Sequence, residues 1–216
     1  MKLTIIIISI ASMLMFNTSI RAQRTFDVGV EGGLNKPNYY GKTRKDQVFF
    51  FGFHLGASVQ TPITEALMLR AGMLYTQKGT KFESVFEQNP GGYAPDLGPL
   101  SNRYHFIELP IHGIYNFSGN LNKFYAGAGP YFGYLTSITT KTNEKKSKID
   151  FSESDYYRRF DVGLSILAGY KVTEKLSVQL GLKNGFVTIS KKKDAGIGKQ
   201  YHRSIELSAR YNLFNK

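Results

Sequence analysis

Hydrophobic and polar residues alternate along eight segments of the chain, most clearly in the segment from Phe49 to Gln60. Successive side chains of a β-strand point to opposite sides, so this alternation predicts a strand with one apolar face. That face comprises Phe49, Phe51, Phe53, Leu55, Ala57 and Val59. Strands of soluble sheets are usually about five or six residues long, whereas a tilted strand needs about nine to eleven to cross a bilayer. The length of the segment therefore indicates a membrane-spanning strand.

Seven more segments show the same period of two, with glycine and polar residues opposite the apolar face. They cover residues 25–34, 67–78, 104–117, 123–136, 161–170, 176–187 and 202–214. Pro110 lies inside one of them, and proline cannot donate a hydrogen bond to a neighbouring strand. We expect a bulge or a locally broken pairing at that residue.

The connections between these segments alternate between long and short. The long ones span 36–48, 79–102, 137–159 and 188–201, and the short ones span 61–66, 118–122 and 172–175. Outer-membrane barrels have short periplasmic turns and longer extracellular loops. After the N-terminal residues no long apolar run remains, so only a closed barrel could span a membrane. The sequence predicts an all-β fold: an eight-stranded antiparallel up-and-down transmembrane β-barrel.

The first 22 residues differ from the rest of the chain. Lys2 precedes an apolar run over residues 3–16, and a small residue, Ala22, follows at the expected cleavage position. The run is shorter than the roughly 20 residues of a spanning helix, which favours a removable signal peptide over an anchor. We expect a signal peptide at 1–22, one barrel domain at 23–216, and export to the bacterial outer membrane.

Charge and composition narrow the functions further. The chain has no cysteine, which excludes disulfides and thiolate chemistry. Its formal charge of +12 falls to +10 once Lys2 and Arg21 leave with the signal peptide. Export argues against nucleic acid as the partner of this charge. We expect a basic patch on the long loops that contacts lipopolysaccharide phosphates, formed by Lys145, Lys146, Lys148, Lys191, Lys192 and Lys193.

The polar faces of the predicted strands fill the barrel interior with charges of both signs. An eight-stranded barrel is just wide enough for side chains to fill it, which argues against an open pore. An unpaired buried charge costs several kcal/mol, so opposite charges there should pair. Lys78 and Asp27 also fall on these faces, and the expected interior ion-pair network comprises Glu31, Arg70, Glu108, Asp161, Lys183, Glu206 and Arg210.

Four sequence motifs carry a family resemblance. They are GFHLGASVQTPITEALMLRAGMLYTQKG, IELPIHGIYNF, FYAGAGPYFGYL and GLSILAGYKVTEKLSVQLGLKNG. With the signal peptide, they resemble the porin-like, PorT-type outer-membrane β-barrel proteins of the Bacteroidetes. For one branch of that group, the resemblance implies an association with protein secretion. We expect a small outer-membrane barrel with a structural or surface-interaction role through its extracellular loops. Partners would be outer-membrane lipid, lipopolysaccharide and a protein bound through the loops, and we expect a monomer.

Two other functions compete with this interpretation. His202 and Ser204, with Glu206 beyond, resemble the His-x-Ser spacing of eight-stranded lipid A deacylases, but their face points inward, away from acyl chains. A secreted lipocalin-like barrel would instead turn its apolar face inward around a ligand.

The remaining histidines do not suggest a metal site. His105 and His112 fall on opposite faces of one strand, and His54 and His112 belong to strands that are not neighbours. We assign no catalytic, metal or cofactor residue and expect no enzyme activity.

Overall fold

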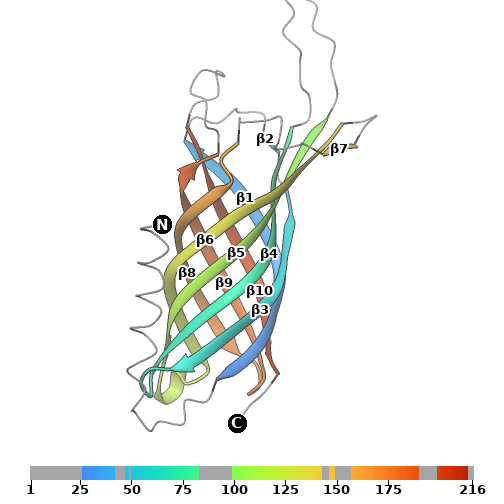
Figure 1. The fold of residues 1–216 in the computed structure, drawn as a ribbon. Coiled ribbons are helices and arrows are strands. Elements are labelled where there is room, and N and C mark those ends of the chain that lie inside the picture. Colours follow the sequence, from blue (N-terminus) through green and yellow to red (C-terminus); the bar gives the residue numbers. More distant parts are fainter. Residues whose placement is uncertain are drawn as a thin grey trace, which may run out of the picture.

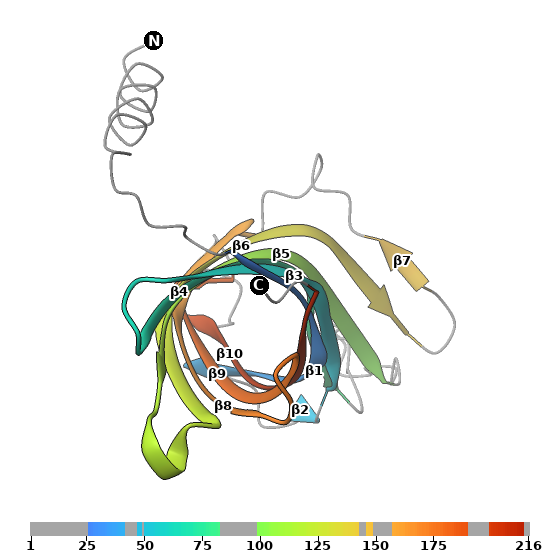
Figure 2. The same ribbon diagram turned by 90° about the horizontal axis from the view of Figure 1, so that it is seen from below.

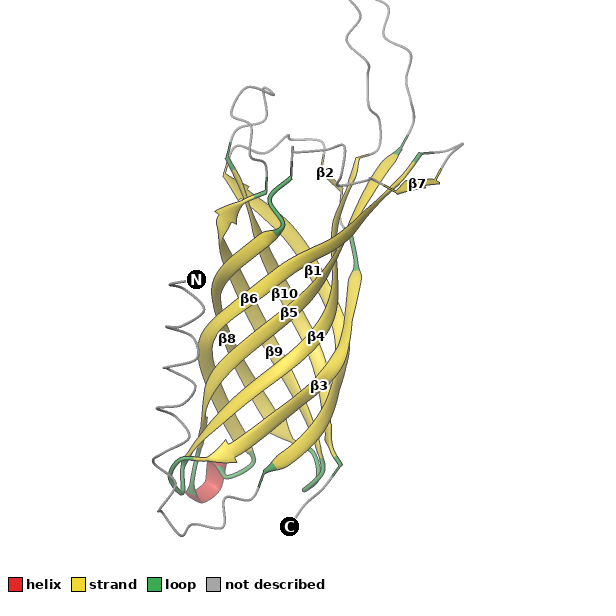
Figure 3. Ribbon diagram, viewed as in Figure 1, coloured by secondary structure: helices red, strands yellow, loops and turns green. Residues whose placement is uncertain are grey.

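The computed structural model describes residues 26–41, 47–48, 50–82, 99–142, 146–148, 157–189 and 199–213, and these are almost entirely β-structure (Figures 1 and 3). The strands are β1 (Asp27–Gly41), β2 (Gln47–Val48), β3 (Gly52–Pro62), β4 (Leu67–Phe82), β5 (Leu100–Asn116), β6 (Phe124–Lys141), β7 (Lys146–Lys148), β8 (Phe160–Lys171), β9 (Leu176–Thr188) and β10 (Gln200–Asn212). One short 3-10 helix, η1 (Gly119–Leu121), lies in a turn, and no helix in the described ranges has the length and hydropathy of a membrane span. The predicted signal peptide at 1–22 lies outside the described residues.

Eight of these strands form a closed ring (Figure 2). Their order is β4-β3-β1-β10-β9-β8-β6-β5, and β5 pairs with β4 to complete the barrel. Every pairing is antiparallel, and the short strands β2 and β7 pair with the loop-side ends of β4 and β6. The prediction of a closed eight-stranded antiparallel barrel is confirmed.

The two ends of the barrel differ. At one end, which we call the turn end, lie the short connections after β3, β5 and β8, together with the start of β1 and the end of β10. The strand ends that border the long connections lie at the opposite end, which we call the loop end (Figure 1). In outer-membrane barrels such short turns face the periplasm, and we therefore expect the loop end of this barrel to face the cell exterior.

Several strands continue farther toward the loop end than the sequence predicted. β1 runs to Gly41, β4 to Phe82 and β6 to Lys141, through residues that we had assigned to loops. β3 begins at Gly52, so Phe51 precedes the strand, and Phe49 lies outside the described residues. The apolar period marks only the part of a strand that faces lipid, whereas backbone pairing continues into water.

Pro110 interrupts the sheet locally without shifting it. The pairs between β5 and β4 resume in the same register on both sides, from Leu74–Glu108 to Ala71–Ile111. Room for the ring comes from Gly72, where an added Cβ would lie 3.3 Å from Pro110 Cγ. The interrupted pairing is as predicted, but the irregular register lies elsewhere, between His105 and Phe106.

The two walls of the barrel have opposite polarity. Large apolar side chains cover the outer wall, including Leu55 and Leu207, each 60% exposed. Inward positions carry buried polar and charged side chains. A lipocalin-like barrel requires the reverse arrangement, with apolar side chains lining an internal ligand site. In this barrel the apolar side chains point outward, so that alternative is wrong.

Candidate functional site in the barrel interior

Among the described residues, eight charged side chains are buried inside the barrel, four of them acidic and four basic. The four acids are Glu31, Glu108, Asp161 and Glu206, and the four bases are Arg70, Lys78, Lys183 and Arg210. All eight lie on the inward face because the alternation of each strand places them there. They form two clusters with different chemistry.

The upper cluster lies toward the loop end and is built from direct ion pairs. Glu108, which is 0% exposed, forms an ion pair with Lys78 Nζ through Oε1 at 2.7 Å. Through Oε2 it accepts a hydrogen bond from Lys183 Nζ, also at 2.7 Å. Lys78 also contacts Asp161 at 3.1 Å, and Lys183 contacts Glu206 at 3.0 Å. The Tyr131 hydroxyl donates to Asp161 at 3.1 Å. Three carboxylates and two ammonium groups thus form one chain across five strands.

The lower cluster lies toward the turn end and is linked through neutral groups. Arg70 donates from Nε to Gln60 Oε1 at 3.1 Å and from Nη1 to Gln179 Oε1 at 3.0 Å. Gln179 Nε2 then donates to Glu31 Oε1 at 2.7 Å, so an amide connects the arginine to the carboxylate.

Arg210, the other base of the lower cluster, also bonds to neutral oxygen atoms. It donates from Nε to Ser58 Oγ at 2.9 Å and from Nη1 to Asn212 Oδ1. Within the described ranges neither Arg70 nor Arg210 makes a direct ion pair.

A small cavity of about 30 Å³ lies between the clusters and touches both. Its lining includes Glu31 and Arg70 from below and Lys183 and Glu206 from above. A buried water needs about 10–15 Å³ of such space and two to four polar partners, so the cavity accommodates about two waters. The walls also hold two histidine–serine contacts: His112 with Ser165, and Ser208 with His54 at 2.8 Å.

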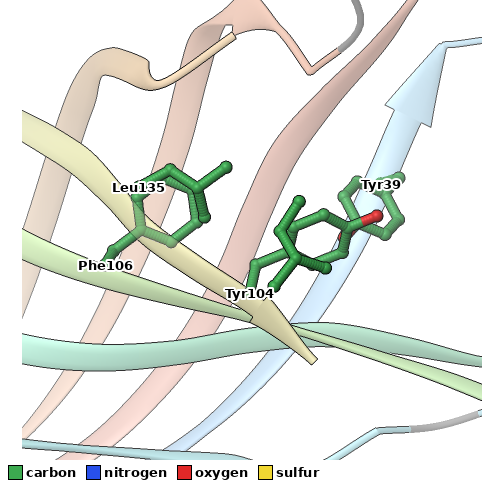
Figure 4. Close-up of a cluster of buried hydrophobic side chains, with 5 residues drawn as sticks. Tyr39, Tyr104, Phe106 and Leu135 are labelled. Carbon is green, nitrogen blue, oxygen red and sulfur yellow. The ribbon is translucent and has the colours of Figure 1, made fainter. Parts of the chain in front are cut away.

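Apolar side chains close the interior beyond each charged layer. Toward the loop end, a buried cluster comprises Tyr39, Tyr104, Phe106, Leu135 and Ile138 (Figure 4). Toward the turn end, Ile114, Tyr125 and Leu167 form a second one, with Met68 packed against it. The interior is therefore layered as apolar, charged, small cavity, charged and apolar.

His202 and Ser204 both lie inside the barrel, as their strand face predicted, but they do not bond to each other. The His202 ring packs among aromatic rings, with its centroid 5.2 Å from that of Tyr39 and 5.4 Å from that of Phe106. The Ser204 hydroxyl donates to Glu206 at 3.2 Å. Among the described residues, Ser204 thus bonds to a carboxylate and not to His202.

The predicted basic patch is only partly within the described residues. Lys146 and Lys148 lie on β7, with exposed side chains. Lys145, Lys191, Lys192 and Lys193 lie outside the described residues.

Sequence reasoning placed Lys78 in the interior but left it out of the expected network, although it contacts two carboxylates. The amide groups of Gln60 and Gln179 and the hydroxyl of Tyr131 were also missed. All of them occupy inward positions of the alternation, which was the available signal. Which side chains they contact depends on the register between strands in the closed barrel. The alternation along a single strand carries no information about that register.

A closed antiparallel barrel with an apolar outer wall and a filled polar interior defines the class of small outer-membrane barrels. A family model described as "Outer membrane protein beta-barrel domain" matches residues 17–191, more than half of the chain, so the chain belongs to this family. It is a protein of the bacterial outer membrane. No curated protein sequence matches it.

Several solved structures are similar in fold. Neisserial surface protein A shares 14% identity, covers 87% of this chain and 97% of its own, and has a TM-score of 0.46. OprG from Pseudomonas aeruginosa shares 12%, covers 91% and 100%, and has a TM-score of 0.44. The protease OmpT from Escherichia coli shares 11%, covers 88% and 98%, and has a TM-score of 0.41. These similarities concern the fold and do not identify an activity.

Proposed function

We propose that this protein is a small outer-membrane barrel with a closed interior that acts in the structure of the membrane or in surface interactions through its extracellular loops. The observation that carries the proposal is the filled interior, in which ion pairs and hydrogen bonds of side-chain amides lie between two apolar clusters. The barrel then serves as a rigid base for the loops.

The packing of the interior supports a closed lumen. Arg210, Tyr131, Lys78 and Phe106 are among the largest side chains that are almost fully buried, and they point inward from four strands. An ion moving through would have to separate Lys78 and Lys183 from Glu108. Breaking a buried pair leaves an uncompensated charge at a cost of several kcal/mol, which opposes a permanent water-filled path.

The loops supply the surface for partners in this proposal. Lys145, Lys146, Lys148, Lys191, Lys192 and Lys193 would contact phosphates of lipopolysaccharide, with a protein partner bound through the same loops. The resemblance to the PorT-type group adds a link to protein secretion to the proposal. We expect the barrel to act as a monomer.

The proposed role is not enzymatic. The Ser204 hydroxyl donates a hydrogen bond to Glu206, and the His202 ring lies in an aromatic environment, so this pair lacks the contact that would activate a serine. Both residues also lie inside a wall whose outer surface faces the acyl chains.

Two measurements on the purified mature protein test the proposal. In planar bilayers we expect no stable single-channel conductance, whereas large, lasting steps would contradict the closed interior. A variant with the six patch lysines changed to Gln should bind lipopolysaccharide more weakly than the parent, with less dependence on salt. Unchanged binding by this variant would refute the role of the loops.

A further inference from the structure

A cluster of polar side chains faces outward near the loop end, on three adjacent strands. It joins Tyr40 of β1, Asn184 of β9 and Arg203 of β10. Asn184 Oδ1 accepts from Arg203 Nε at 3.1 Å, and Asn184 Nδ2 donates to the Tyr40 hydroxyl at 3.1 Å. The Tyr40 hydroxyl donates in turn to the Gly185 carbonyl at 2.6 Å. The three side chains are thereby fixed to one another and to the backbone.

The guanidinium of Arg203 is held in one orientation by this cluster. Its Cζ atom lies 4.8 Å from the centre of the Tyr40 ring, which itself stacks on Tyr201 at 5.1 Å. The Arg203 side chain is exposed, and across the described ranges its two Nη groups form no hydrogen bond or ion pair. A guanidinium with its Nε fixed presents the Nη groups as a rigid pair of donors, which suits the oxygens of a phosphate.

An apolar wall begins directly below this arginine. Ile205 and Leu207 follow on the outer face of β10 and are 47% and 60% exposed. Leu182 of β9 pairs with Ile205, and Leu34 of β1 pairs with Leu207, and both side chains are also exposed. The surface thus has the Arg203 guanidinium near the loop end and an apolar strip that faces lipid next to it. This arrangement suits an anionic amphiphile, whose charged group and acyl chains would contact the two parts.

Carboxylates do not compete for Arg203 in the described part of the chain. The seven described acids are either buried inside the barrel or near the turn end: Asp27, Glu31, Glu65, Glu108, Asp161, Glu174 and Glu206. Arg203 is near the loop end, where β10 begins. A phosphate that reaches it from the membrane meets positive charge on this part of the outer wall.

We propose that Arg203, held against Tyr40 by Asn184, binds the phosphate of a phosphorylated glycolipid of the outer leaflet, whose acyl chains lie on Ile205 and Leu207. This inference rests on the orientation proposed above, with the loop end at the cell exterior. It assigns specific recognition to one arginine on the barrel wall, whereas the loop lysines supply a diffuse electrostatic contact.

Binding of diphosphorylated lipid A to the mature protein, folded in detergent and followed by native mass spectrometry, tests the site. Arg203→Gln should weaken binding about tenfold, in line with the loss of charge-assisted hydrogen bonds. Arg203→Lys keeps the charge but loses the fork, so its loss should be about threefold, and Tyr40→Leu should behave similarly. The matched control is Lys81→Gln, which removes an exposed charge from β4 at the same end. Its binding should equal that of the parent.

Two probes identify the ligand chemistry. Dephosphorylated lipid A should bind the parent at least as weakly as diphosphorylated lipid A binds Arg203→Gln, because it also loses the contact with the loop lysines. Inorganic phosphate should not displace the lipid, because it lacks acyl chains. Equal losses in Arg203→Gln and Lys81→Gln, or binding independent of lipid phosphate, would overturn the site, and full displacement by inorganic phosphate would show a simple anion site. The mobility of the unheated band on gels confirms that each variant is folded. Channel conductance tests the closed interior separately, so either idea can fail without the other.

Discussion

The two charged layers inside the barrel stabilise their bases in different ways. In the upper cluster, Lys78 and Lys183 contact carboxylates directly and share Glu108. In the lower cluster, Arg70 reaches Glu31 only through the amide of Gln179. Among the buried side chains, the upper cluster has one acid more than it has bases, and the lower cluster has one base more than it has acids. The partly buried Asp27 accepts from Gln60 of the lower cluster at 3.3 Å, so its carboxylate offsets the surplus base of that layer.

The largest expected effect is the loss of Glu108, because one substitution removes the shared partner of two buried lysines. Glu108→Leu should lower the free energy of unfolding by about 3 to 5 kcal/mol, the usual cost of leaving a buried charge unpaired. Urea unfolding of the protein in lipid vesicles measures the change. Glu108→Gln keeps the shape and serves as the control for packing. Parent-like stability of the Leu variant would show that the upper cluster is hydrated or unimportant.

Loss of Arg70 should cost less, because its direct partners are neutral. Arg70→Leu removes two hydrogen bonds to amide oxygens and should destabilise the barrel by about 1.5 to 3 kcal/mol, the range for hydrogen bonds to a charged group. The same unfolding assay applies, with Leu69→Ala on the outer face as the control for a change in this strand. A cost equal to that of Glu108→Leu would mean that the two layers do not differ as their contacts indicate.

Double-mutant cycles should show coupling within a layer and independence between layers. Lys78 and Asp161 are in contact, so Lys78→Met and Asp161→Leu should couple by about 0.5 to 3 kcal/mol. Lys78 and Arg70 are eight residues apart on β4, which is about 26 Å at about 3.3 Å per residue. The effects of Lys78→Met and Arg70→Met should add to within about 0.5 kcal/mol. Strong coupling between these two would indicate that the layers act as one network.

The sequence predicted the strands and their faces well because the period of two is a local property of the chain. It placed Glu108, Lys183 and Arg210 inside without any knowledge of their neighbours. It could not predict that Glu108 lies between Lys78 and Lys183, since that depends on the stagger of strands that are far apart in sequence. The extension of β1 to Gly41 was missed because the apolar signal ends where the lipid ends.

The smallest expected effect concerns the cavity between the layers, which Gly181 lines from β9. A Cβ added there would meet no atom closer than 3.7 Å, so Gly181→Ala fits without strain. The substitution restricts the unfolded chain and should raise stability by about 0.4 to 1 kcal/mol.

Gly129 of β6 is the matched contrast. A Cβ there would lie 1.9 Å from the Ile111 carbonyl oxygen, so Gly129→Ala should destabilise the barrel. Urea midpoints of both variants, compared with the parent, measure the difference. A destabilising effect of Gly181→Ala would contradict this expectation. It would indicate that the added methyl group displaces water that hydrates the charged side chains lining the cavity.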